Sequence, residues 1–198
     1  MPLEGPVSRY VNRRISMPAA RLLAATPLTP NAVSVLALAV ATAAGALIGA
    51  GRNVEGGVLV QASSVVDGMD GDLARAQGRE SRFGAVFDSV LDRYADAAIA
   101  AGMAWYAWKH EDWRAPLVAG LAALVGFLMV SYSRARLEAE GGAAMTAELL
   151  GLASRDVRLL LLALAAIAGQ AYWGLIVVAA LSYATVAWRL AAFFGRSS

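Results

Sequence analysis

The chain has 198 residues, of which 59% are hydrophobic and 16% are charged, and its mean hydropathy is +0.55. This composition excludes an ordinary soluble globule, because soluble domains carry about 25% charged residues. The formal net charge of +2 gives no sign of nucleic-acid binding. The absence of cysteine excludes a disulfide framework, a thiolate nucleophile and a cysteine-based zinc site.

Basic and apolar side chains alternate over residues 8–26, before the first long apolar run. The basic ones are Arg9, Arg13, Arg14 and Arg21, and the apolar ones include Tyr10, Val11, Ile15 and Leu22. This pattern predicts an amphipathic helix on an anionic membrane surface, with a disordered basic tail as the alternative. The start of the chain lacks the order of a signal peptide. We therefore expect an interfacial segment at 1–28 and a transmembrane domain at 29–198.

Six apolar runs follow. Residues 30–50 carry no charge over 21 residues, and about 20 apolar residues suffice to cross a bilayer core. The other candidates are about 54–76, 83–108, 115–133, 159–174 and 173–194. The sequence thus predicts an all-α integral membrane protein with six transmembrane helices preceded by an amphipathic membrane-surface helix. Arg52, Lys109 and Arg114 fall on one side and most other basic residues on the opposite side, which predicts both termini in the cytoplasm, at the cell membrane.

Five aspartates gather between residues 67 and 92, where the second expected span meets the third. Three residues share one face of the incoming helix at i, i+3 and i+7, namely Asp67, Asp70 and Ala74. Three share one face of the outgoing helix at i, i+4 and i+8, namely Gly84, Asp88 and Asp92. Gly78 is a helix stop and Ser81 an N-cap between them. Two antiparallel helices can therefore aim four carboxylates at one point, whereas Asp72 faces away.

Four carboxylates at one point repel one another unless protons or a cation neutralise them. Oxygen ligands without cysteine favour Mg²⁺, Mn²⁺ or Ca²⁺ over zinc. Gly71 and Gly84 leave room for a ligand, and Arg75 can meet a phosphate with its guanidinium. The pattern predicts a metal site for a pyrophosphate-bearing substrate. The alternative is a set of interfacial charges paired with nearby arginines.

Arginines also gather at the expected cytoplasmic ends of the last three spans. These are Arg134, Arg155, Arg158 and Arg189. Several guanidinium groups around one cavity suit an acceptor that is itself a phosphate monoester. Ordinary flanking charge is the alternative for any one of them.

Residues 67–92 read D-x2-D-G-x2-A-R-x8-G-x3-D-x3-D. This resembles the signature of the CDP-alcohol phosphotransferases, or phosphatidyltransferases, and the family layout of a surface helix and six spans covers nearly the whole chain. The resemblance implies homodimers and an Mg²⁺- or Mn²⁺-dependent displacement of CMP from a CDP-linked donor by a hydroxyl.

By matching position, the resemblance implies a role for each residue of the signature. The metal ligands would be Asp67, Asp70, Asp88 and Asp92, and Asp92 would also be the base that takes the acceptor proton. The donor would be bound by Asp67, Gly71, Ala74, Arg75 and Gly84. In relatives that use inositol phosphate, basic residues of the same three helix ends bind the acceptor phosphate. This implies that role for Arg134, Arg155 and Arg189, to which their position adds Arg158.

A closer likeness lies in RYVNRRIS, LTPNAVS, FDSVLDRYADA and SRDVRL. These segments resemble the membrane domain of di-myo-inositol phosphate phosphate synthases, which implies CDP-inositol as donor and inositol 1-phosphate as acceptor. Many such enzymes carry a soluble cytidylyltransferase domain ahead of the membrane part. Here Met1 stands a few residues before the expected surface helix. We therefore expect either that a separate protein makes the donor or that this is a stand-alone homologue, which leaves the donor open.

Two alternatives stay open. A phospholipid synthase would use the same metal site with a CDP-lipid donor and with inositol phosphate or glycerol 3-phosphate as acceptor. It would need a lipid-accessible groove beside the cavity. A cation-coupled transporter would also hold intramembrane acids, but it predicts acids at mid-membrane and internal repeats, and the sequence has neither.

Overall fold

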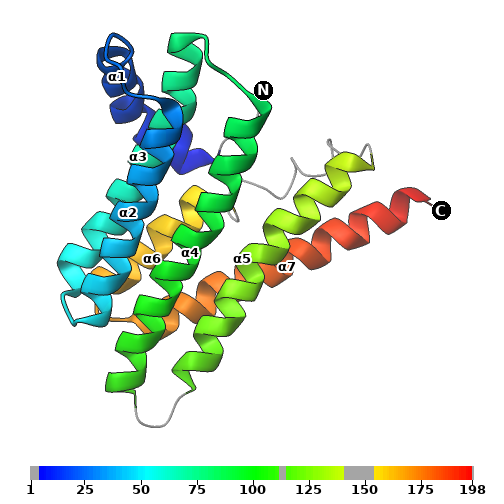
Figure 1. The fold of residues 1–198 in the computed structure, drawn as a ribbon. Coiled ribbons are helices and arrows are strands. Elements are labelled where there is room, and N and C mark those ends of the chain that lie inside the picture. Colours follow the sequence, from blue (N-terminus) through cyan, green and yellow to red (C-terminus); the bar gives the residue numbers. More distant parts are fainter. Residues whose placement is uncertain (1–4, 112–114, 141–153, 198) are drawn as a thin grey trace.

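The computed structural model describes residues 5–111, 115–140 and 154–197, and the regular elements in these ranges are all helices (Figure 1). A π-helical turn, Ser8–Asn12, continues into α1, Arg13–Leu23. The longer helices are α2, Pro30–Gly49, α3, Asn53–Gln77, α4, Arg82–His110, and α5, Pro116–Ala139. Two more complete the chain, α6, Arg155–Ile167, and α7, Ala171–Ser197. The predicted all-α class is confirmed for the described residues.

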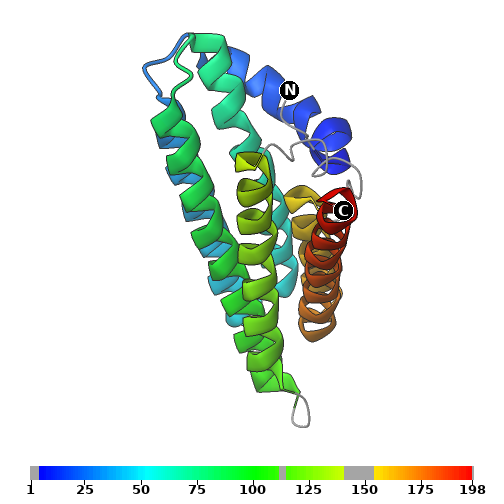
Figure 2. The same ribbon diagram turned by 90° about the vertical axis from the view of Figure 1, so that its right-hand side faces the viewer.

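The helices form two packed groups around a common core. α2 packs against both α3 and α4, while α5 lies along α7 and also contacts α4 (Figures 1 and 2). α6 packs against α3 and α7 and so joins the two groups. Ile48, Ile99, Met103, Leu162 and Leu175 are fully buried in the core between them. This packing brings together helix ends that are distant in sequence.

Glycines let α2 and α4 approach closely. A Cβ on Gly45 would lie 2.3 Å from the carbonyl oxygen of Ala98, and one on Gly102 would lie 2.0 Å from that of Gly45. Neither position tolerates a side chain without a backbone shift. Small residues at such contacts are a common packing solution between membrane helices.

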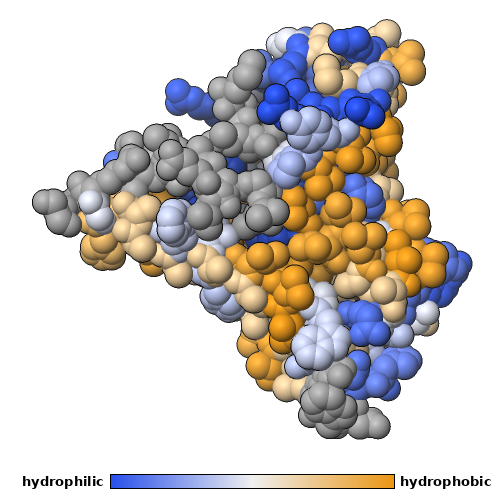
Figure 3. All heavy atoms as spheres, turned by 180° about the vertical axis from the view of Figure 1, so that it is seen from behind, coloured by the Kyte–Doolittle hydropathy of each residue, from blue (hydrophilic) through white to orange (hydrophobic). Residues whose placement is uncertain are grey.

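Within the described residues, three helices are long and apolar enough to cross a membrane by length and composition, namely α2, α5 and Ala171–Gly195 of α7. Motif charges interrupt the apolar runs of α3 and α4, and α6 has 13 residues, or about 20 Å of helix. The count of six spans therefore remains a prediction. Apolar surface runs across the middle of one face, with hydrophilic residues towards both ends (Figure 3).

The N-terminal helix packs on α3 through small and polar side chains. Asn12, Ser16 and Ala20 are each 1% exposed. Asn12 donates to Ser64 Oγ at 3.0 Å, and Ser16 donates to Asp72 at 3.0 Å. A second set of side chains on this helix is exposed and apolar: Tyr10, Val11, Ile15 and Leu22. The helix thus packs through one set of side chains and exposes another, while the amphipathic membrane-surface helix remains a prediction. Residues 1–4 of the predicted 1–28 segment lie outside the described residues.

Candidate active site

Local signals set the two helices that carry the motif. α3 ends at Gln77 because Gly78 adopts a φ of +61°, a left-handed conformation that favours glycine. α4 begins at Arg82, where the Ser81 hydroxyl accepts a hydrogen bond from the backbone N–H of Gly84 at 3.0 Å. The predicted helix stop and N-cap are both confirmed. The two helices therefore reverse direction within four residues and present their motif faces to a shared space.

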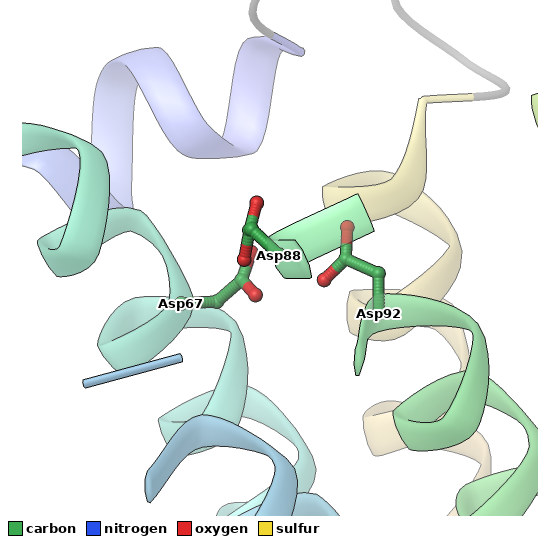
Figure 4. A group of neighbouring side chains, drawn as sticks. All are labelled: Asp67, Asp88 and Asp92. Carbon is green, nitrogen blue, oxygen red and sulfur yellow. The ribbon is translucent and has the colours of Figure 1, made fainter. Parts of the chain in front are cut away.

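Three of the predicted metal ligands come together in this space. Asp67 of α3 and Asp88 and Asp92 of α4 point towards one another (Figure 4), each offering a carboxylate oxygen within 4.8 Å of the other two. The fourth, Asp70, lies beside Asp88. Its carboxylate accepts hydrogen bonds from the Ser34 hydroxyl of α2 and from the backbone N–H of Gly71.

The chemistry of this cluster fits a hard divalent cation. All of its donors are carboxylate oxygens, which suit Mg²⁺, Mn²⁺ or Ca²⁺. Asp88 Oδ1 is buried and has no hydrogen-bond partner among the described residues. A buried, unpartnered carboxylate oxygen is costly, and a metal ion is one of the groups that can satisfy it. Asp67, Asp88 and Asp92, with Asp70 beside Asp88, would hold the ion.

The carboxylates open into a cavity of about 840 Å³. All twelve residues predicted to bind metal, donor or acceptor line it: Asp67, Asp70, Gly71, Ala74, Arg75, Gly84, Asp88, Asp92, Arg134, Arg155, Arg158 and Arg189. The walls come from α2 to α7, with Gly5 and Ser8 of the N-terminal segment at one edge. Residues predicted from four separate stretches of sequence thus share one cavity.

The residues of the predicted donor side lie along α3 and the start of α4. A Cβ on Gly71 would lie 3.6 Å from the Arg75 guanidinium, and one on Gly84 would lie 3.4 Å from Asn31 Oδ1. Arg75 pairs with Asp72 at 2.6 Å. Asp72 also accepts a hydrogen bond from the Ser16 hydroxyl. It therefore faces the N-terminal helix and points away from Asp67, Asp88 and Asp92, as its helical phase predicts.

The predicted acceptor arginines divide into two groups. Arg158 is 3% exposed, stacks over Phe127 at 4.8 Å, and its Nε has no hydrogen-bond partner among the described residues. Arg189 donates to Val130 O at 2.7 Å and Ser133 Oγ at 3.0 Å, while Arg134 pairs with Glu138 at 2.8 Å. These three leave donors available to a ligand in the cavity. A guanidinium has five N–H donors, which exceeds the bonds that each of them makes.

Arg155 is the second group, since its guanidinium lies among the carboxylates. Its Nη1 is 2.7 Å from Asp67 and 2.8 Å from Asp92, and its Nε is 3.0 Å from Asp96. Asp96 is not among the residues predicted from the sequence. Its spacing was a usable signal, because Asp96 continues the i+4 series of Gly84, Asp88 and Asp92 by one more turn.

Comparison with known proteins agrees with this geometry. Residues 27–193 match the family model described as CDP-alcohol phosphatidyltransferase. The chain belongs to this family, which confirms the resemblance seen in the signature. The four aspartates of the signature lie within the matched region.

The relatives of this chain include bifunctional transferases and synthases. The chain is 48% identical over 190 residues to a bifunctional IPC transferase and DIPP synthase of Rubrobacter xylanophilus, covering 96% of this chain and 42% of that protein. It is 38% identical over 137 residues to phosphatidylinositol phosphate synthase of Mycobacterium tuberculosis, covering 68% of this chain and 63% of that protein. This chain therefore spans less than half the length of the Rubrobacter relative.

Two solved structures of the M. tuberculosis phosphatidylinositol phosphate synthase share the fold. One, in complex with manganese and citrate, superposes with a TM-score of 0.77 at 31% identity over 89% of this chain and 87% of that chain. The other, with CDP-DAG bound, has a TM-score of 0.75 at 32% identity over 89% and 92% of the two chains.

Proposed function

We propose that this protein transfers a substituted phosphoryl group from a CDP-linked donor to an alcohol hydroxyl and releases CMP. The observation that carries the proposal is the single cavity in which three carboxylate oxygens lie within 4.8 Å of one another, beside the glycines and Arg75 of the family signature. The proposal is supported by the structures of the M. tuberculosis synthase with manganese and with CDP-DAG.

In the proposed reaction, the acceptor oxygen attacks the phosphorus that bears the donor's alcohol group. A new P–O bond forms, the P–O bond to the bridging oxygen breaks, and CMP leaves with that oxygen. Asp92 takes the proton of the acceptor hydroxyl. Gly71, Ala74 and Gly84 make room for the donor at the helix surfaces, and Arg75 binds its diphosphate. Mg²⁺ or Mn²⁺ at Asp67, Asp70, Asp88 and Asp92 would offset the negative charge that develops on the diphosphate oxygens.

A phosphorylated polyol is the acceptor that the arginines favour. Arg158 is buried and keeps an unpartnered Nε, and Arg189 has no carboxylate partner at hydrogen-bond distance among the described residues. A buried guanidinium with free donors is stabilised by a bound anion. Arg155 joins this set to the carboxylates and Arg134 lines the same cavity, so the acceptor hydroxyl would lie towards Asp92.

Two donors have specific support. CDP-inositol with inositol 1-phosphate, giving di-myo-inositol phosphate phosphate, is our preferred pair, because the Rubrobacter relative named DIPP synthase matches 96% of this chain. A CDP-lipid donor with inositol phosphate or glycerol 3-phosphate is the second, because the M. tuberculosis structure binds CDP-DAG.

The same proposal includes the location of the protein in the membrane. Six spans, a membrane-surface helix and a cytoplasm-facing cavity at the cell membrane agree with the apolar band and with the exposed Val11, Ile15 and Leu22 of the N-terminal helix. A homodimer remains a prediction from the family resemblance.

The experiment that tests this proposal measures CMP release by the purified protein in Mg²⁺ across two donors and three acceptors. The donors are CDP-inositol and CDP-diacylglycerol, and the acceptors are inositol 1-phosphate, glycerol 3-phosphate and free inositol. We expect release with CDP-inositol plus inositol 1-phosphate. Release with the lipid donor alone would replace our preferred donor by the second one. No release from any of the pairs would contradict the proposed reaction with these substrates.

A further inference from the structure

Asp96 is a buried carboxylate that the proposed reaction does not use. It lies one helical turn beyond Asp92 on α4 and is 2% exposed. Its Oδ1 accepts a hydrogen bond from Arg155 Nε at 3.0 Å, and its Oδ2 lies 3.4 Å from Arg93 Nη1. A charge in such a place is costly unless it is paired. The pairing with Arg155 is therefore the main compensation for its burial.

Arg155 connects Asp96 to the carboxylate group of Asp67, Asp88 and Asp92. Its Nη1 contacts Asp67 Oδ2 at 2.7 Å and Asp92 Oδ1 at 2.8 Å, so one nitrogen bridges a carboxylate of α3 and one of α4. The guanidinium is planar and rigid, so a bond that fixes Nε also fixes the direction of Nη1. Asp96 thereby determines where Arg155 meets the two proposed ligands.

The contact with Arg155 acts on the proposed ligands in two opposite ways. It fixes Asp67 Oδ2 and Asp92 Oδ1, which leaves Asp67 Oδ1 for a cation, while Asp92 Oδ2 lies 3.4 Å from Arg93 Nη2. Its positive charge, however, repels that cation. Asp96 offsets this repulsion because its own charge lies 3.0 Å from Arg155 Nε. Without the Asp96 charge, Asp67 and Asp92 alone would balance Arg155 and would hold it more tightly.

We propose that Asp96 is a positioning residue that supports divalent-cation binding at Asp67, Asp88 and Asp92 by holding and neutralising Arg155. This inference rests on the proposed function. It assigns Asp96 no contact with substrate or metal. Residues that hydrogen-bond the ligands of a metal, or orient their partners, commonly change metal affinity about 10- to 100-fold when they are replaced.

The test is a titration of the purified full chain with Mn²⁺ alone, in which electron paramagnetic resonance measures free Mn²⁺. Asp96→Asn is expected to raise the Kd for Mn²⁺ by about 10- to 100-fold. The same substitution in an Arg155→Gln background is expected to change Kd by about twofold or less, because the residue through which Asp96 acts is then gone. Asp72→Asn is the matched control, with Kd unchanged, since Asp72 pairs with Arg75 outside the cluster.

Two results would overturn the role of Asp96. One is a Kd for Asp96→Asn within about twofold of the unmodified protein. The other is an equal loss of affinity in both backgrounds, which would make Asp96 a nearby charge that does not act through Arg155. If Asp96→Asn does not fold, Asp96→Glu, which keeps the charge, is compared with Asp96→Ala. The proposal requires that Asp96→Glu bind Mn²⁺ more tightly than Asp96→Ala. If Asp88→Asn bound Mn²⁺ as tightly as the unmodified protein, the metal site itself would be overturned. The proposed reaction is tested separately, by CMP release.

Discussion

Replacing Asp92 by asparagine is expected to lower kcat for CMP release by about 10²- to 10⁴-fold, the usual contribution of general-base catalysis. The amide keeps the shape of the side chain but cannot take the acceptor proton. Donor binding depends more on Gly71, Ala74, Arg75 and Gly84, so the KM for the donor should change much less than kcat. Steady-state kinetics with varied donor and saturating acceptor measures both quantities.

Glu140→Gln is the matched control for Asp92→Asn. Glu140 pairs with Arg136 at the exposed end of α5 at 2.9 Å, and neither residue lines the cavity. Its replacement makes the same chemical change and should leave kcat unaltered. A kcat for Asp92→Asn equal to that of this control would contradict the assignment of Asp92 as the base.

Replacing Arg158 by glutamine is expected to raise the KM for a phosphorylated acceptor by about 10- to 100-fold. A hydrogen bond to a charged group contributes about 1.5–3 kcal/mol, and about 1.4 kcal/mol corresponds to a factor of ten. Arg158 lies far from the residues of the donor side in the sequence and on a different helix. The KM for the donor should therefore stay unchanged. Kinetics with inositol 1-phosphate and with free inositol separates the effect on the phosphate from a general loss of activity.

Arg136→Gln provides the control for Arg158→Gln, because Arg136 is an exposed arginine paired with Glu140 outside the cavity. Both KM values should stay unchanged in this variant. If Arg158→Gln impaired the reaction of free inositol as much as that of inositol 1-phosphate, Arg158 would not bind the acceptor phosphate.

The parts of the fold and site that the sequence predicted correctly depend on local geometry. Gly78 and Ser81 set the ends of α3 and α4 by backbone conformation and a side-chain cap, and both signals act within a few residues. The facing stripes that carry Asp67 and Asp92 follow from helical periodicity alone. The exclusion of Asp72 from the carboxylate group of Asp67, Asp88 and Asp92 follows from the same periodicity.

The contacts that the sequence did not predict join distant segments. Arg155 and Asp96 are 59 residues apart, and Ser34 and Asp70 are 36 apart. Helical phase gives the face on which a residue lies but not which helix packs against that face. Arg155 was therefore predicted as an acceptor ligand from its place at a helix end and from the family resemblance, while its partners became visible only in three dimensions. The number of spans is open for another reason, since functional charges in α3 and α4 weaken the hydropathy signal.

The measurement that tests the central claim most directly is the stoichiometry of CMP and phosphodiester product. The purified protein would be given Mg²⁺, labelled CDP-inositol and inositol 1-phosphate, with CDP-diacylglycerol as a parallel donor. Phosphoryl transfer predicts one new phosphodiester for each CMP released, and loss of both products when a chelator removes the metal. CMP formed without a new phosphodiester would show that water is the acceptor and would contradict the proposed transferase.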